Sequence, residues 1–224
     1  MVAGGSGRRF GGPKQFLHLA GRPVAAWSVD AARTVADGVV LVVPEGADDD
    51  PGQMGPSGGG ESACSPAPWG ADRMVTGGGS RADSVRAGLR AVPDEATVIV
   101  VHDAARPLAP PSLFTAVVEA VLVAGASCAI PVLPVADTLK RTAGGMVVST
   151  VDRDGLVTVQ TPQAFTAAVL RTAHREGGLA TDDAGLVEQM GVAVHTVPGD
   201  PRNLKITRME DLAVAEALMV EAPR

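Results

Sequence analysis

The sequence predicts a doubly wound α/β fold with a mostly parallel sheet. Short runs rich in Val and Ile are typical of buried strands, and they recur at 39–43, 97–101, 127–132 and 192–197. Helical patterns alternate with these runs, at 23–35, 81–92, 111–123 and 208–220. This alternation favours parallel strands joined by helices, with ligands bound beyond the carboxyl ends of the strands.

The chain opens on a glycine-rich segment that includes Gly4, Gly5 and Gly7 and carries the cations Arg8, Arg9 and Lys14. Glycines let backbone N–H groups approach phosphate oxygens closely, while Arg and Lys supply positive charge. The spacing matches neither the dinucleotide fingerprint nor the GxxxxGK[ST] phosphate loop. We therefore expect a nucleotide phosphate site outside those two families.

The next segments are a helix, a strand and a long insertion. Pro23 stands at a plausible first helical position, and strand 39–43 follows the helix. Residues 44–72 are crowded with Gly, Pro, Ser and Asp, which predicts a flexible loop. A second glycine turn, 77–79, then leads into helix 81–92, where Ser80 is either a simple N-cap or part of an anion-binding helix start.

Strand 97–101 runs into His102-Asp103-Ala104-Ala105-Arg106-Pro107, which puts a carboxylate and a guanidinium just past a strand end. Asp103 is suited to a ribose hydroxyl or to a phosphate-bound Mg²⁺. The equally weighted alternative is an Asp103–Arg106 ion pair that only completes a turn.

Residues 137–160 interrupt the alternation. We expect strands at 146–151 and 156–160 to flank a turn at Asp152-Arg153-Asp154-Gly155, forming a hairpin arm that projects from the sheet with Arg153 at its tip. A two-stranded ribbon is marginal alone in water, so a second subunit is its expected partner. The arm and all the other elements belong to a single domain spanning 1–224.

Composition excludes several classes of protein. The formal charge of −6 argues against a general nucleic-acid binder. No apolar run approaches the ~18 residues of a membrane span, and the N-terminus lacks the apolar core of a signal peptide. Cys64 and Cys128 are far apart and outside metal-ligand spacing, which favours free thiols in a reducing, cytoplasmic location.

Nine short motifs occur in one order. They are A-G-G-S-G-R-R, P-K-Q-F-L, G-G-S-R-A-D-S-V, H-D-A-A-R-P, D-T-L-K-R, V-D-R, Q-T-P-Q-A-F, T-D-D-A and N-L-K-I-T. Over nearly the whole chain except 44–72, this series resembles the 2-C-methyl-D-erythritol 4-phosphate cytidylyltransferase family. The resemblance implies a Rossmann-like nucleotidyltransferase fold and a homodimer formed through the arm. It also implies a reaction of CTP with methylerythritol phosphate that uses Mg²⁺ and releases pyrophosphate.

The resemblance also implies roles for individual residues. Arg9 and Lys14 would stabilise the α-phosphate in its pentavalent state, with Arg153, acting across the dimer, and Lys205 positioning methylerythritol phosphate. The nucleotide would contact Ala3, Gly4, Gly5, Gly7, Gly78, Gly79, Ser84 and Asp103. The second substrate would contact Asp103, Arg106, Thr138, Arg153, Thr161, Thr181 and Lys205. Asp103 is the expected protein contact of Mg²⁺, which would be held mainly by the CTP phosphates.

One feature departs from the family pattern. The family has several apolar residues in a central strand before the glycine loop, whereas only Met1-Val2-Ala3 stand there in this sequence. We therefore expect this strand to be nearly missing and the loop to be poorly anchored, which affects CTP binding more than the fold.

Three other functions would also suit parts of this sequence. A cytidylyltransferase for another polyol phosphate, such as ribitol 5-phosphate, stays open, as does a non-catalytic dimeric binding protein. A short-chain reductase would also suit a glycine loop on an α/β sheet, but it needs a catalytic tyrosine, and this chain has none.

Overall fold

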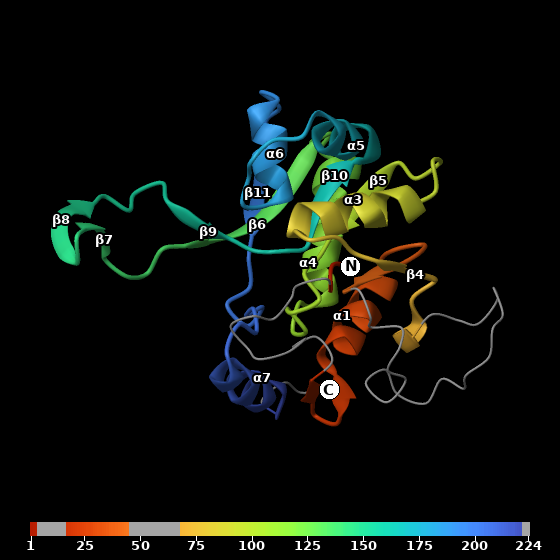
Figure 1. Ribbon diagram of the computed structural model, residues 1–224, viewed down its shortest axis with the longest axis horizontal. Coiled ribbons are helices and arrows are strands. Elements are labelled where there is room, and N and C mark those ends of the chain that lie inside the picture. The colour runs from red at the N-terminus through yellow and green to blue at the C-terminus, as the bar shows by residue number, and fades with distance from the viewer. Residues whose placement is uncertain (4–16, 45–67, 221–224) are drawn as a thin grey trace.

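The computed structural model describes residues 1–3, 17–44 and 68–220, and they form the α/β architecture that the sequence predicts (Figure 1). The four predicted strands correspond to β3 (Val40–Val43), β5 (Val98–Val101), β6 (Cys128–Pro134) and β11 (His195–Pro198). The four predicted helices correspond to α1 (Val24–Arg33), α3 (Arg81–Ala91), α4 (Pro111–Leu122) and α7 (Met209–Val220). Pro23 precedes α1 as its N-cap instead of opening it.

The main sheet is mixed, because an unpredicted strand enters its middle. Its order is β11-β6-β10-β5, and β10 (Gln163–Thr166) runs antiparallel to both of its neighbours. Only the pairing of β11 with β6 is parallel within this sheet. The parallel pairing expected from the sequence is therefore found in two places. One is the pair of β11 with β6, and the other is the pair of β3 with β4 (Arg73–Thr76), which forms a two-stranded sheet of its own.

The backbone of Met1–Ala3 joins these two sheets. Val2 forms parallel bridges to Val42 and Asp103, donating its N–H to the His102 carbonyl at 2.8 Å, while Ala3 N–H donates to the Val42 carbonyl at 2.7 Å. The Met1 amine donates to the Val40 carbonyl at 2.9 Å, and burial lowers the pKa of this amine to about 6. Met1–Ala3 thus form a short ladder of backbone hydrogen bonds on both sides, the central ladder, with bridges at Val2 in place of a full strand. The expected poor anchoring of the glycine loop concerns residues 4–16, which lie outside the described residues.

Side chains of the sheet alternate between two helix layers, as strand geometry requires. Cys128, Ile130 and Phe165 pack in one core cluster with residues of α3, α5 (Ala167–Glu176) and α6 (Asp183–Gln189). Ala129 and Ala164 face the other way, against α4. Helices thus cover both faces of the sheet, as a doubly wound fold predicts.

Cys128 is a free thiol whose pKa is raised to about 12 by burial, so it is inert.

The sequence did not predict α5, α6 or β10. The strand β10 contains only one large apolar side chain, Phe165, so its pattern is weak even though it is central. Two short strands, β1 (His18–Leu19) and β2 (Arg22–Pro23), and a 3₁₀ turn at Pro68–Gly70 complete the elements. Among the described residues, no helix is long and apolar enough to cross a membrane.

The arm projects from the body, but its pairing differs from the prediction (Figure 1). The hairpin consists of β7 (Leu139–Ala143) and β8 (Met146–Val151), joined at Gly144 and Gly145. Both glycines have positive φ, 55° and 77°, which is the requirement of a tight two-residue hairpin turn. The predicted turn at 152–155 instead returns the chain to β9 (Val157–Val159), which pairs with β6.

Most of the predicted flexible loop, residues 45–67, lies outside the described residues, as does Cys64. The segment that follows it is ordered by an Arg33–Asp72 ion pair of 3.2 Å and by a hydrogen bond from Val39 N–H to the Asp72 carboxylate.

Candidate active site

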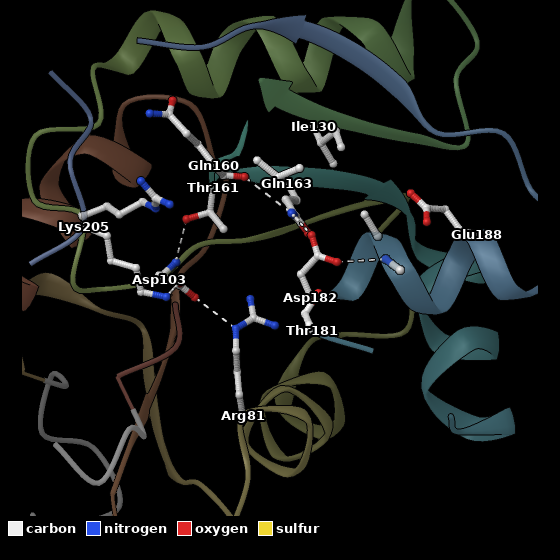
Figure 2. Close-up of a pocket in the computed structure, with 14 residues that line it drawn as sticks. Arg81, Asp103, Ile130, Gln160, Thr161, Gln163, Thr181, Asp182, Glu188 and Lys205 are labelled. Carbon is white, nitrogen blue, oxygen red and sulfur yellow. Dashed lines mark hydrogen bonds and ion pairs between the residues drawn. The ribbon is translucent and has the colours of Figure 1, made fainter. Parts of the chain in front are cut away.

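A pocket of about 420 Å³ opens beyond the carboxyl end of β5, where the fold class predicts a ligand (Figure 2). Side chains from four regions converge on it: the start of α3, the end of β5, the segment entering β10 and the start of α6. Lys205 reaches it from the segment before α7. Its polar lining includes Arg81, Asp103, Arg106, Gln160, Thr161, Gln163, Thr181, Asp182, Glu188 and Lys205.

Asp103 is the central charge of the pocket. Its Oδ1 accepts a hydrogen bond from Arg81 Nε at 3.1 Å, and its Oδ2 accepts one from Lys205 Nζ at 2.5 Å. Although burial opposes ionisation of this carboxyl, the positive charges of Arg81 and Lys205 hold its pKa well below the usual range. Asp103 is therefore a carboxylate with both oxygens engaged, and its ion pairs are not with Arg106, so the simple turn reading is wrong.

Arg106 lines the pocket with Asp103, but no carboxylate pairs with its guanidinium among the described residues. Its Nη1 donates to the Asn203 carbonyl at 2.7 Å, while its buried Nε has no hydrogen-bond partner among the described residues. Burial lowers the pKa of the guanidinium, but the group stays charged at neutral pH. A half-buried guanidinium that lines a pocket and has a buried donor to spare is well suited to an anionic ligand.

Buried amides hold the segment that carries Lys205. Asn203 donates from Nδ2 to the Thr161 carbonyl at 2.9 Å, and Gln160 donates from Nε2 to the Asp200 carbonyl at 2.9 Å. Ile206 N–H donates to the Ala105 carbonyl at 2.8 Å. These directed bonds dock the chain before α7 against the end of β5, which brings Lys205 to Asp103.

His102 stabilises this arrangement as a neutral ring. Its Nε2 lies 3.2 Å from the Arg106 carbonyl, which can only accept, so Nε2 carries the proton. Its Nδ1 is therefore an acceptor, and it lies 3.1 Å from the hydroxyl of Thr161, which also accepts from Asp103 N–H at 3.0 Å. Burial lowers the pKa of His102 to about 3. Both ring nitrogens are engaged, so His102 positions neighbours and is not placed to transfer protons.

The far wall of the pocket carries hydrogen-bond acceptors. Gln163 Nε2 donates to Asp182 Oδ2 at 2.8 Å, and Asp182 also caps α6 by accepting from Gly185 N–H at 3.0 Å. Gln163 Oε1 is buried without a partner among the described residues, and Glu188 lines the same wall. This side of the pocket suits hydroxyl groups, whereas the side of Arg106 and Lys205 suits an anion.

The second glycine turn lies outside the pocket lining. Ser80 forms a capping box with Asp83, which confirms its N-cap role. Ser84 is fully buried, accepting from Gly78 N–H at 3.3 Å and donating to the Ser80 carbonyl at 3.0 Å. A Cβ on Gly78 would lie 2.4 Å from the Asp83 Cβ, so only glycine fits, whereas Gly79 faces open space. Ser84 thus holds the turn in shape.

Besides Ala3 and the second glycine turn with Ser84, the predicted site residues fall into three groups. Asp103, Arg106, Thr161, Thr181 and Lys205 line the pocket together. Thr138 and Arg153 are exposed on the arm and do not line it, and Arg153 lies on the return segment, not at the tip, where it donates to the Ala136 carbonyl. Gly4, Gly5, Gly7, Arg9 and Lys14 lie outside the described residues, whereas Ala3 is buried in the central ladder.

The described residues offer no ready metal site. They contain no group of three or more His, Cys, Asp or Glu side chains able to hold an ion. Because both oxygens of Asp103 are engaged by cations, Asp103 does not fit the predicted role of metal ligand in this arrangement.

Sequence reasoning missed several polar residues of the site. Arg81, Gln160, Gln163, Asp182 and Asn203 all stand in or beside the ordered motifs, so the signal was present, but no role was assigned to them. Arg81 is the most important, because it also pairs with buried Asp183 at 2.7 Å.

Comparisons with known proteins point to one family. The family model described as IspD, 2-C-methyl-D-erythritol 4-phosphate cytidylyltransferase, matches residues 1–221. The enzyme of that name from Frankia casuarinae is 45% identical over 98% of this chain and 79% of its own length. The one from Nocardia farcinica is 45% identical over 98% and 92%. The crystal structure of the Thermus thermophilus enzyme aligns with a TM-score of 0.79 and 35% identity, covering 98% of this chain and 96% of its own.

Neutral His102 makes stability depend on pH in a defined direction. The folded state keeps the ring unprotonated down to about pH 3, whereas the unfolded state takes up a proton near 6.5. Falling pH therefore favours the unfolded state, and this contribution is lost as pH falls from about 6.5 toward about 3. We expect the free energy of unfolding of wild type to fall more steeply than that of His102→Asn below pH 6.5, by up to about 1.4 kcal/mol per pH unit.

Urea denaturation at a series of pH values measures both curves. Above pH 6.5 the two proteins should differ by a constant amount, which serves as the internal control. Parallel curves throughout the acid range would show that His102 titrates normally in the folded protein.

Proposed function

This chain belongs to the 2-C-methyl-D-erythritol 4-phosphate cytidylyltransferase family, and we propose that it catalyses the reaction for which the family is named. The substrate phosphate attacks the α-phosphate of CTP in line, giving 4-diphosphocytidyl-2-C-methyl-D-erythritol and pyrophosphate. The chain is accordingly a nucleotidyltransferase of isoprenoid biosynthesis by the non-mevalonate route.

The observation that carries the proposal is that two cations, Arg106 and Lys205, line the same pocket. Arg106 has a buried Nε without a partner among the described residues, and Lys205 already touches the carboxylate of Asp103. A phosphate dianion would satisfy both cations at once. The opposite wall, with Thr181, Asp182 and Glu188, can accept hydrogen bonds from the hydroxyls of a polyol.

The chemistry requires no general base. A phosphate monoester has a second pKa near 6 and is largely dianionic at neutral pH, so the attacking oxygen is already a nucleophile. The structure agrees with a reaction that needs no base, because both ring nitrogens of His102, beside the pocket, are already engaged. The barrier lies in bringing a dianion to a polyanionic triphosphate, and positive charge placed in advance lowers it.

The glycine loop is proposed to supply the rest of that charge. By family resemblance, Arg9 and Lys14 stabilise the pentavalent α-phosphate, and Gly4, Gly5 and Gly7 present backbone N–H groups to it. Gly78 and Gly79 are the proposed cytidine contacts together with Ala3, whereas Ser84 is fully buried and supports their turn. Asp103 is the proposed contact of a sugar or sugar phosphate.

A divalent cation, Mg²⁺, is part of the proposal through the substrate only. We propose that it enters on the oxygens of the CTP triphosphate, where it neutralises charge, because Asp103 is not free to bind it. A cytoplasmic location likewise stays a prediction.

The test of the reaction is pyrophosphate release from CTP, with methylerythritol phosphate and ribitol 5-phosphate assayed in parallel. We expect turnover with methylerythritol phosphate and little with ribitol 5-phosphate, since the family is named for the former. Preferred turnover of ribitol 5-phosphate would assign the chain to the other polyol phosphate. Silence with both, in a protein that still binds CTP, would favour a non-catalytic binding protein.

Loss of a single positioned cation should slow the reaction strongly. We expect Lys14→Ala and Lys205→Ala each to lower kcat by about 100- to 1000-fold, by analogy with removal of one oxyanion-hole donor. Arg208→Ala is the matched control for Lys205, because it removes an exposed cation from the same segment. Near-wild-type turnover of either lysine variant in steady-state assays would contradict its assignment.

The arm supports a proposed homodimer. Its strand β8 exposes Met146, Val147 and Val148 at 73%, 63% and 62% of their surface, which is unusual for consecutive apolar side chains. We propose that a second copy of the chain covers them, bringing Thr138 and Arg153 of one protomer to the substrate of the other.

A charge on this strand should therefore separate the subunits. We expect Val148→Asp to convert the dimer to a monomer and to abolish most turnover, because the pocket then lacks the other arm. Sedimentation velocity and pyrophosphate release measure the two effects. Val123→Asp, which changes an 82% exposed valine at the end of α4, is the control and should preserve both. Full activity from a wild-type monomer would overturn the arm's proposed role.

A further inference from the structure

A line of alternating charges runs from the pocket into the interior of the protein. Lys205 pairs with Asp103, Asp103 with Arg81, and Arg81 Nη1 donates to Asp183 Oδ2 at 2.7 Å. Asp183 Oδ1 then accepts from His174 Nε2 at 2.9 Å. The side chains of Asp183 and His174 are only 1% and 3% exposed, so the line ends far from solvent.

Local helix chemistry does not account for this line. Asp182, not Asp183, caps α6. Arg81 is the first residue of α3, where the positive end of the helix dipole disfavours a cation. Burial further disfavours the charged guanidinium, yet Asp103 and Asp183 raise its pKa above the ordinary value. The two carboxylates are therefore what keep Arg81 in place.

The geometry of Arg81 explains how it can link the two carboxylates. The guanidinium is planar and presents Nε and Nη1 in a fixed fork, so its bond to Asp183 dictates the direction of its bond to Asp103. The imidazole of His174 makes its one hydrogen bond among the described residues to Asp183, since its buried Nδ1 has no partner there. His174 thereby holds the carboxylate of Asp183 in place, and Asp183 in turn holds Arg81.

We propose that Asp183 and His174 are positioning residues for the reaction, acting through Arg81 to hold Asp103 in the orientation that presents Lys205 to the substrate phosphate. The proposal rests on the proposed function, because it concerns the same pocket. With Oδ1 of Asp103 held by Arg81, Oδ2 is directed to Lys205. Weakening the inner pairs would let this carboxylate rotate, and Lys205 would move with it.

Asp183→Asn tests this link, because it removes the charge while keeping the size of the side chain and one acceptor oxygen. We expect kcat/KM for methylerythritol phosphate to fall about 10-fold or more, as small displacements of reacting groups do. His174→Phe should give a smaller loss in the same direction, since it removes only the hydrogen bond to Asp183.

A double-mutant cycle separates positioning from stability. If Asp183 acts through Arg81 and Asp103, adding Asp183→Asn to Asp103→Asn should cost no more than Asp103→Asn alone. A purely structural effect on folding would instead add to the effect of Asp103→Asn. All variants are compared well below their melting temperatures, with the folded fraction checked by circular dichroism.

Arg171 provides the matched control on the same helix. It lies one turn before His174 on α5 and donates to the carbonyls of Leu89, Val92 and Pro93, so it ties α5 to the end of α3 without touching the pocket. We expect Arg171→Gln to lower the melting temperature while leaving kcat/KM within about twofold of wild type, as changes away from a site do.

A spectroscopic measurement on Arg81 tests the link from Asp183 to Arg81 without relying on enzymatic turnover, and so independently of the proposed function. In nitrogen-15 spectra, the Nε–H signal of Arg81, assigned by its loss in Arg81→Lys, should be sharp and slow to exchange in wild type and broadened in Asp183→Asn. An inactive wild type would count against the proposed function only, and these spectra would still decide the inner link. An unchanged Arg81 signal in Asp183→Asn, or unchanged kcat/KM, would overturn the proposal.

Discussion

The buried carboxylate of Asp103 is the constraint on which the site depends. A charge in this position is costly unless cations meet it, and two do so, Arg81 from 22 residues before it and Lys205 from 102 residues after it. Three distant segments must therefore converge at the end of β5 before the charge is stable. The same convergence forms the pocket, so one group of charges both holds these segments together and lines the cavity.

Neutral hydrogen bonds give that convergence its direction. Thr161, His102 and Asn203 link the end of β5, the segment entering β10 and the segment before α7 through short, oriented contacts. Such bonds fix orientation but leave charge unchanged, which suits a reaction whose nucleophile is already ionised. The histidine of this site thus orients its neighbours, since both of its ring nitrogens are engaged.

The central ladder and the arm illustrate two different structural requirements. Met1–Ala3 is only three residues long, yet it is satisfied on both sides by β3 and the segment after β5. The described residues before the glycine loop are therefore held by backbone hydrogen bonds on both sides. The arm is longer but lacks such cover, and its apolar side chains face outward. A second chain over the arm would cover these side chains.

The sequence by itself determined the α/β class, the four main helices and strands, and five residues that meet in the pocket, because hydrophobic periodicity and strand-end position are local signals. It did not determine the partner of each strand. The segments 146–151 and 156–160 both looked extended, but the positive φ of Gly144 and Gly145 paired β8 with β7, and β9 paired with β6. Strand β10 was hidden because one apolar residue gives no periodicity. The ion pairs of Arg81 with Asp103 and Asp183 were decided by the tertiary structure alone, since only packing brings charges so distant in sequence within hydrogen-bonding reach and removes the water that would otherwise solvate them.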